Sequence, residues 1–166
     1  MINKITPLVK GLITGVLMLA ITLSLIYSKQ SADGGLSYLV YAVYAGGIAW
    51  TLIAYSRSPN YNPSFGSIFG QGFRCFIVVV LVIVTFTAVY GYMHPEIAEE
   101  AAKLTKESLL KEGAKSDKTP AEIDIIAETI KKQYITSIIS QTIFGTLLTG
   151  AIFTAAGAGL LLMRKK

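Results

Sequence analysis

The sequence predicts an all-α integral membrane protein, a four-helix bundle with a charged extramembrane helical hairpin between spans 3 and 4. Hydrophobic residues make up 52% of its 166 residues, more than a soluble domain of this size usually carries. Charge is concentrated instead in residues 94–134, which hold nine of the ten Asp and Glu residues and seven of the fifteen Lys and Arg residues. A chain of this length is expected to form a single membrane domain, residues 1–166.

Four apolar segments define the predicted spans, at about residues 8–27, 36–55, 73–92 and 138–163. The third is rich in Val and Ile, but its length without turn signals favours a membrane helix over a buried strand. Aromatic side chains at both ends of the second are typical of the bilayer interface. Ahead of the third span, Ser64 is expected to cap a short helix that lies along the membrane surface before the chain turns in.

Small residues mark the faces through which the spans are expected to pack. Gly11 and Gly15 form a G-x-x-x-G pair, which lets another helix approach closely. In the fourth span, small and weakly polar residues recur every four positions in two neighbouring rows. Gln141, the most polar side chain within a span, is interpreted as an interhelical hydrogen-bonding group. The predicted helix-packing residues are Gly11, Gly15, Gln141, Gly145, Thr146, Gly150 and Thr154.

Residues 95–134 are expected to form two helices joined near residues 113–118. Residues 119–122 (Thr-Pro-Ala-Glu) are a capping box with proline at the first helical position, which fixes where the second helix begins. Because no Gly or Pro lies between Ala121 and Phe144, this helix is expected to run on into the fourth span.

Apolar side chains on the second insertion helix form a candidate partner face, made of Ile123, Ile126, Ile130 and Tyr134. Two interpretations of this face remain open. The stripe either packs on the first insertion helix, which would make the hairpin self-contained, or it docks another protein. An isolated two-helix hairpin buries little area, so packing within the hairpin does not settle the question.

The distribution of charge predicts that both termini lie in the cytoplasm. In this orientation every Asp and Glu lies on the outer side of the membrane, opposite the cytoplasm. The inner loop, residues 56–74, then carries two arginines, whereas the outer loop, residues 28–35, carries one lysine. The cationic residues placed inside are Lys4, Lys10, Arg57, Arg74, Arg164, Lys165 and Lys166.

The sequence offers no convergent set of catalytic or metal-ligating residues. It has one histidine, His94, and one cysteine, Cys75, and the predicted spans contain no carboxylate. A non-enzymatic protein without a cofactor or metal is therefore expected. Gly66, Gly70 and Gly72 match neither the dinucleotide fingerprint nor the phosphate loop. The net charge of +5 is scattered rather than clustered on one face, which argues against nucleic-acid binding.

The one histidine is interpreted as a water-exposed residue at the membrane interface. A pH-responsive role is the alternative, because histidine titrates near neutral pH, but the sequence names no partner for it.

Three motifs, taken in order, resemble a known family. They are Lys-Gly-Leu-Ile-x-Gly at residues 10–15, Ser-Phe-Gly-x-x-Phe-Gly-x-Gly-Phe-Arg at residues 64–74, and tyrosines 90 and 92 ahead of His94-Pro95-Glu96. With these, the chain resembles an uncharacterised family of four-helix bacterial inner-membrane proteins, described only as a domain of unknown function. The likeness covers nearly the whole chain. It implies the fold and a multi-pass position in a Gram-negative inner membrane, and it implies no activity or catalytic residues.

Two functions from different classes are compatible with these features. The first is an accessory or scaffold subunit that meets another membrane or periplasmic protein through its outer hairpin. The second is a small oligomeric transporter or channel. Transporters usually carry ionisable residues or broken helices at mid-membrane depth, and the middle of each predicted span is uncharged. Membrane lipid is expected as a partner in both cases, and a homo-oligomer is compatible with both.

Overall fold

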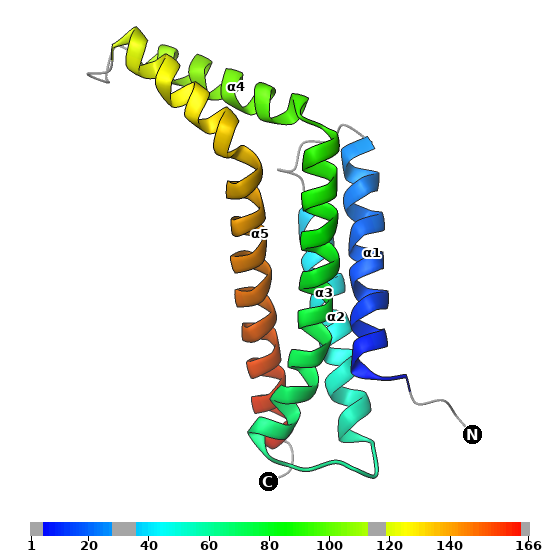
Figure 1. Ribbon diagram of the computed structural model, residues 1–166. Coiled ribbons are helices and arrows are strands. Elements are labelled where there is room, and N and C mark those ends of the chain that lie inside the picture. The colour runs from blue at the N-terminus through cyan, green and yellow to red at the C-terminus, as the bar shows by residue number, and fades with distance from the viewer. Residues whose placement is uncertain (1–4, 28–35, 113–118, 164–166) are drawn as a thin grey trace. The chain divides into compact units, whose positions relative to one another are not determined.

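The computed structural model describes residues 5–27, 36–112 and 119–163, and within these ranges every regular element is an α-helix. The predicted join of the hairpin, residues 113–118, lies outside the described residues. The helices are α1 (Pro7–Tyr27), α2 (Leu36–Ser56), α3 (Phe65–Met93), α4 (Glu96–Glu112) and α5 (Pro120–Met163), as labelled in Figure 1.

Four of these helices, α1, α2, α3 and α5, are long and apolar enough to cross a membrane. The prediction of an all-α protein with four membrane-length helices is therefore confirmed. The chain divides into two compact units. The bundle unit comprises Met1–Ile83 and Ile143–Lys166, and the hairpin unit comprises residues 84–142. Helices α3 and α5 contribute residues to both.

Local signals in the sequence explain where α1 and α3 begin. Pro7 occupies the first position of α1, and the N–H of Val9 donates a hydrogen bond to Thr6 Oγ1 at 3.4 Å. At α3, the N–H of Ser67 donates to Ser64 Oγ at 3.3 Å, so Ser64 is the N-cap.

The separate surface helix expected after Ser64 is absent from this part of the chain. Instead, α3 runs for 29 residues without a break. No proline interrupts it, and three of its phenylalanines stack in sequence. The ring centroids lie 5.7 Å apart for Phe65 and Phe69, and 6.5 Å apart for Phe69 and Phe73. These contacts between successive turns favour continuing the helix.

The start of α5 has the geometry of a capping box. The backbone N–H of Thr119 donates to Glu122 Oε2 at 2.7 Å, and the N–H of Glu122 donates to Thr119 Oγ1 at 3.4 Å. From Pro120 the helix continues for 44 residues to Met163, as the absence of helix breakers predicts.

Glycines give the bundle unit its close helix contacts. A Cβ at Gly11 of α1 would meet the backbone carbonyl oxygen of Cys75 on α3, and one at Gly15 would lie 3.1 Å from Val82 Cβ. A Cβ at Gly47 of α2 would overlap the Thr14 side chain of α1. These helices therefore approach too closely for larger residues at the contact points.

Helix α5 meets the rest of the bundle unit in the same way. A Cβ at Gly150 would meet the Tyr44 hydroxyl and the Phe76 ring, and the Tyr44 hydroxyl donates a hydrogen bond to the Thr146 carbonyl at 3.0 Å. A Cβ at Gly157 would lie 2.6 Å from Leu52 Cδ1. Exposed large apolar side chains, spaced four or eight residues apart, point away from these contacts, and they are Phe144, Leu148, Ile152 and Leu160.

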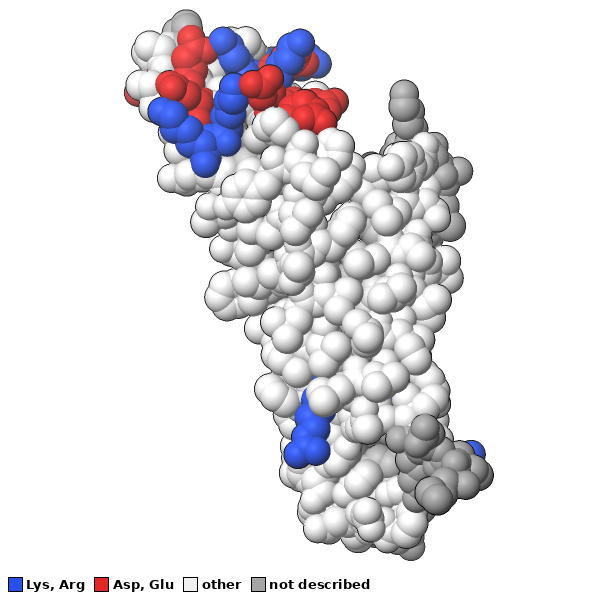
Figure 2. All heavy atoms as spheres, turned by 45° about the vertical axis from the view of Figure 1, so that its right-hand side comes forward, with Lys and Arg blue, Asp and Glu red and all other residues white. Residues whose placement is uncertain are grey.

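Helix α4 and the first part of α5 hold the hairpin unit together through few apolar residues and several ion pairs. Ala98, Ala102 and Ile123 are its buried apolar side chains. Between the two helices, Lys131 Nζ lies 2.6 Å from Glu99 Oε1, and Lys106 pairs with Asp124. Figure 2 shows this mixture of positive and negative side chains on the surface of the hairpin unit.

Candidate functional site

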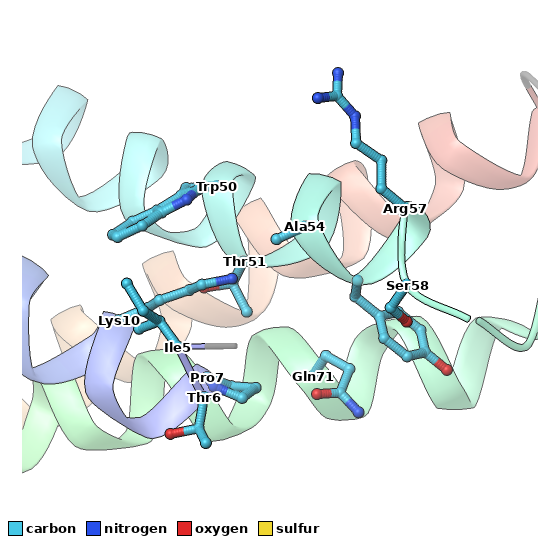
Figure 3. A pocket seen from close by; sticks show the side chains of 11 residues that line it. Ile5, Thr6, Pro7, Lys10, Trp50, Thr51, Ala54, Arg57, Ser58 and Gln71 are labelled. Carbon is cyan, nitrogen blue, oxygen red and sulfur yellow. The ribbon is translucent and has the colours of Figure 1, made fainter. Parts of the chain in front are cut away.

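A pocket of about 480 Å³ lies in the bundle unit, where α1 begins, α2 ends and the first turns of α3 pass. Figure 3 shows its lining side chains. Lys10 of α1 extends beneath the indole of Trp50, and Gln71 of α3 faces the same space from below. The walls are largely apolar, with Ile5 and Pro7 contributing from the start of α1.

Lys10 is the buried cation of this pocket. Only 6% of its surface is exposed, and its Nζ lies 5.3 Å from the centroid of the Trp50 ring, within the range of a cation–π interaction. Arg57 also lines the pocket, but Figure 3 shows its guanidinium directed away from the other side chains. The positive charge inside the pocket therefore comes from Lys10.

Two hydroxyl groups of the pocket differ in their bonding. Thr51 Oγ1 donates to the Gly47 carbonyl at 3.0 Å and is satisfied within its own helix. Ser58 Oγ is buried and has no hydrogen-bond partner among the described residues. Buried polar atoms are nearly always paired, so this hydroxyl is available to bond a group that enters the pocket.

A second, smaller hollow of about 330 Å³ lies along α5 within the hairpin unit. It is lined by Ile130 and Tyr134, with the polar side chains Gln133, Ser137 and Gln141 around them. Its lining comes from one face of one helix, so it is a surface depression rather than an enclosed chamber.

A protein-family model described as "Protein of unknown function (DUF4199)" matches residues 10–164. The chain belongs to the DUF4199 family. The resemblance to an uncharacterised membrane-protein family is thereby confirmed. The matched region includes Lys10, Trp50, Ser58 and Gln71 of the pocket and the whole of α4 and α5. Searches of curated proteins and of solved structures returned no match.

The helix-packing residues predicted for this DUF4199 chain do not all lie in helix contacts. Gly11, Gly15, Gly150 and Thr154 do, with Thr154 against Gly72 of α3. Gly145 differs, because a Cβ there would meet nothing within 4 Å. Gly145 lies in the same row of the helix surface as Gln141. That row is separated by one residue, a rotation of about 100° around the helix axis, from the row of Gly150 and Thr154, which makes the contacts.

Gln141 also differs from its predicted interhelical role. Its side-chain Nε2 donates to Ser137 Oγ at 3.2 Å, one turn earlier in α5, and the residue is exposed. Gln141 therefore satisfies its amide along its own helix while lining the hollow of the hairpin unit.

The four residues of the candidate partner face separate into two groups. Ile123 is 2% exposed and belongs to the buried core of the hairpin unit. Ile126, Ile130 and Tyr134 are half-buried, and the last two line the hollow. Among the described large apolar side chains of α4 and of the part of α5 that belongs to this unit, the most exposed are Leu104, Leu110 and Ile125.

His94 has a carboxylate neighbour that sequence reasoning did not identify. Its Nδ1 lies 2.6 Å from Glu96 Oε1, and its ring centroid lies 4.4 Å from that of Tyr90. The hydrogen bond from His94 is the main cause that lowers the pKa of the Glu96 carboxyl below its ordinary value. Among the residues that the structure describes, no group of His, Cys, Asp and Glu is arranged to hold a metal ion.

Sequence reasoning placed Lys10 among the cations that set topology and did not predict its burial. One signal was present: a lysine that follows Pro7 by three residues, inside an apolar helix whose neighbours carry no acid. Its aromatic partner Trp50 comes from another helix, and no local pattern identifies such a contact.

Proposed function

We propose that this protein is a non-enzymatic accessory subunit of a bacterial inner membrane, and that its hairpin unit binds a helix of another membrane protein. The observation that carries the proposal is the hollow along α5 at Ile130 and Tyr134. Its lining combines the apolar side chains of Ile130 and Tyr134 with the polar side chains of Gln133, Ser137 and Gln141, and such mixtures are common at protein interfaces.

The position of the hollow in the chain favours a membrane helix as the occupant. Charged residues of α5 end at Lys132, and the helix is uncharged from Gln133 to its last described residue, Met163. The hollow, which starts at Thr129, therefore lies where α5 changes from charged to apolar composition. A partner helix that also changes from charged to apolar residues at this level would match both the polar and the apolar side chains of the hollow.

The buried state of Ile123 restricts how this surface can be tested. A charge at Ile123 would disturb the packing of α4 on α5 and would not report on a partner. Ile130 and Tyr134 are half-buried and suit the test better.

A photo-reactive amino acid at position 134, in the full chain in its native cells, would test the proposal. The expected product is one discrete cross-link to a different membrane protein, and Ile130→Asp on the same chain should abolish it. The matched control places the photo-reactive group at Leu160, whose side chain is 67% exposed on the outer face of α5 and should cross-link to lipid only.

Two outcomes would contradict an accessory role. A cross-link from position 134 to lipid alone would show that the hollow faces the bilayer without a partner. A cross-link only to a second copy of the same chain would favour the alternative, an oligomeric transporter or channel.

The orientation proposed with this role has both termini in the cytoplasm. Its support is the positive-inside pattern, since Arg57 lies between α2 and α3 and Arg74 lies in the first turns of α3, while every acid lies elsewhere in the chain. Labelling of Asn3→Cys by a membrane-impermeant thiol reagent in intact cells would contradict this orientation.

A further inference from the structure

Lys10 needs a counter-charge that no described residue of the bundle unit provides. An ammonium group removed from water is costly unless charge or hydrogen bonds replace its hydration. Ionisable residues within membrane helices accordingly mark binding sites more often than packing positions. The Trp50 ring compensates for part of this cost, but it is an uncharged partner.

Within the described residues of the bundle unit there is no Asp or Glu. Asp33 is the one acid that the sequence places outside the hairpin unit, and it follows the opposite end of α1. The helical rise from Lys10 to Tyr27, the last residue of α1, is about 25 Å.

The other polar groups of the pocket are suited to an oxyanion. Ser58 Oγ is buried without a partner among the described residues and can donate a hydrogen bond. The Gln71 amide also lines the pocket and offers two donors. The pocket is bounded at the start of α1 by Thr6 and Pro7, and the N-terminus of a helix attracts negative charge.

We propose that this pocket binds the phosphate group of an anionic phospholipid, with Lys10 as the cation that recognises it. A phosphate oxygen is the acceptor that an ammonium group, a hydroxyl and an amide can share. A phosphate group in the pocket would neutralise the charge of Lys10, and one of its oxygens would accept a hydrogen bond from the Ser58 hydroxyl.

The walls of the pocket favour a lipid over a free phosphate ion. Ile5, Pro7, Trp50 and Ala54 present apolar surface to the same space that Lys10 lines. Ile5 is 47% exposed and Trp50 is 43% exposed, so this apolar surface continues to the outside of the bundle unit. The glycerol and the first acyl carbons of a lipid would cover it, whereas an inorganic ion would leave it uncovered.

The test measures lipid retention by the full chain, stripped of lipid in detergent and examined by native mass spectrometry. The probes are dioleoyl-phosphatidylglycerol, which is anionic, and dioleoyl-phosphatidylcholine, which is zwitterionic. Both lipids carry a phosphate, but phosphatidylcholine also brings a cation that Lys10 repels. Wild-type protein should therefore retain the anionic lipid with a preference of about tenfold. Lys10→Met, which keeps most of the side-chain length, should remove that preference.

Two matched variants separate recognition from loss of a positive charge. Arg74→Met removes a cation from an exposed residue of α3 that does not line the pocket, and it should leave the preference unchanged. Lys10→Arg should restore most of it. Ser58→Ala should weaken the retention of both lipids, because both carry the phosphate to which its hydroxyl would donate.

The proposal is overturned if Arg74→Met and Lys10→Met reduce the preference equally, or if wild-type protein retains both lipids alike. The second measurement uses wild-type protein alone, so it decides the matter even if Lys10→Met fails to fold. Displacement of phosphatidylglycerol by excess sodium phosphate would show that the site takes a free ion, and this would overturn the lipid assignment.

Discussion

The bundle unit and the hairpin unit hold their helices together in different ways. In the bundle unit, glycines bring backbones into contact, as at Gly11 against the Cys75 carbonyl. The hairpin unit has ion pairs between exposed side chains, such as Lys131 with Glu99, and among its described residues Ile123 is the one large apolar side chain that is buried. Close packing tolerates few substitutions, whereas exposed ion pairs contribute little and are screened by salt. The difference teaches that a hairpin rich in charge still depends on its small apolar core.

The largest expected effect comes from the core of the hairpin unit. Ile123→Ala should destabilise the contact between α4 and α5 by about 3 kcal/mol, the cost of removing a large buried side chain. Ile125→Ala, at a side chain that is 64% exposed, should change stability by about 0.5 kcal/mol or less. Hydrogen exchange of the α4 amides in the full chain measures both. Equal protection in the two variants would mean that the ion pairs hold this unit instead.

The next effect compares two adjacent glycines of the bundle unit. Gly47→Ala places a methyl group against three atoms of Thr14, including its Cβ, so α1 and α2 must separate. The expected cost is about 2 kcal/mol by overpacking. Gly46→Ala meets nothing within 4 Å and should be neutral, or stabilising by about 1 kcal/mol through helix propensity.

Thermal unfolding of the purified protein in detergent distinguishes these two glycines. The double variant Gly47→Ala with Thr14→Ala should recover part of the loss, because it removes two of the three overlapping atoms. If Gly46→Ala and Gly47→Ala lower the unfolding temperature alike, the close approach of α1 to α2 does not stabilise the bundle unit.

The smallest effect concerns His94 and Glu96. The pKa of Glu96 is lower in the folded protein than its ordinary value of 4.5 because His94 donates a hydrogen bond to its carboxylate. The pairing therefore stabilises the fold at pH values above the ordinary pKa, and this contribution is lost as the pH falls through the lowered value. His94→Ala should return the Glu96 pKa toward 4.5, as carbon-13 NMR of the carboxyl group would show. An unchanged titration in that variant would mean that the backbone sets this pKa.

Features set by neighbouring residues in the chain were predictable from sequence. The capping box of α5 involves Thr119 and Glu122, which are three residues apart, and the structure reproduces its hydrogen bonds. Likewise, Gly11 and Gly15 are one turn apart and occupy a helix contact. In both cases a short pattern determines the geometry locally.

Contacts between residues of different helices were not predictable in this way. The isoleucine stripe of α5 indicated burial, but the sequence did not say that Ile123 packs within the hairpin unit while Ile130 lines a hollow. Gly47 carries no motif, and its importance comes from Thr14 on another helix. The pocket has the same origin, since Lys10 and Trp50 come from separate helices. Such pairings depend on helix rotation, which periodicity specifies only to within a residue or so.

The burial of Cys75 makes the native chain its own reporter of breathing motions. This thiol is the only one in the sequence and is 0% exposed, against the Gly47 carbonyl at 3.9 Å. A maleimide can reach this thiol only while α3 is transiently separated from the neighbouring helices. The rate of labelling therefore measures how often the bundle unit opens, without any engineered mutation. A cysteine added on an exposed surface would react first, and the two signals would remain separable by their rates.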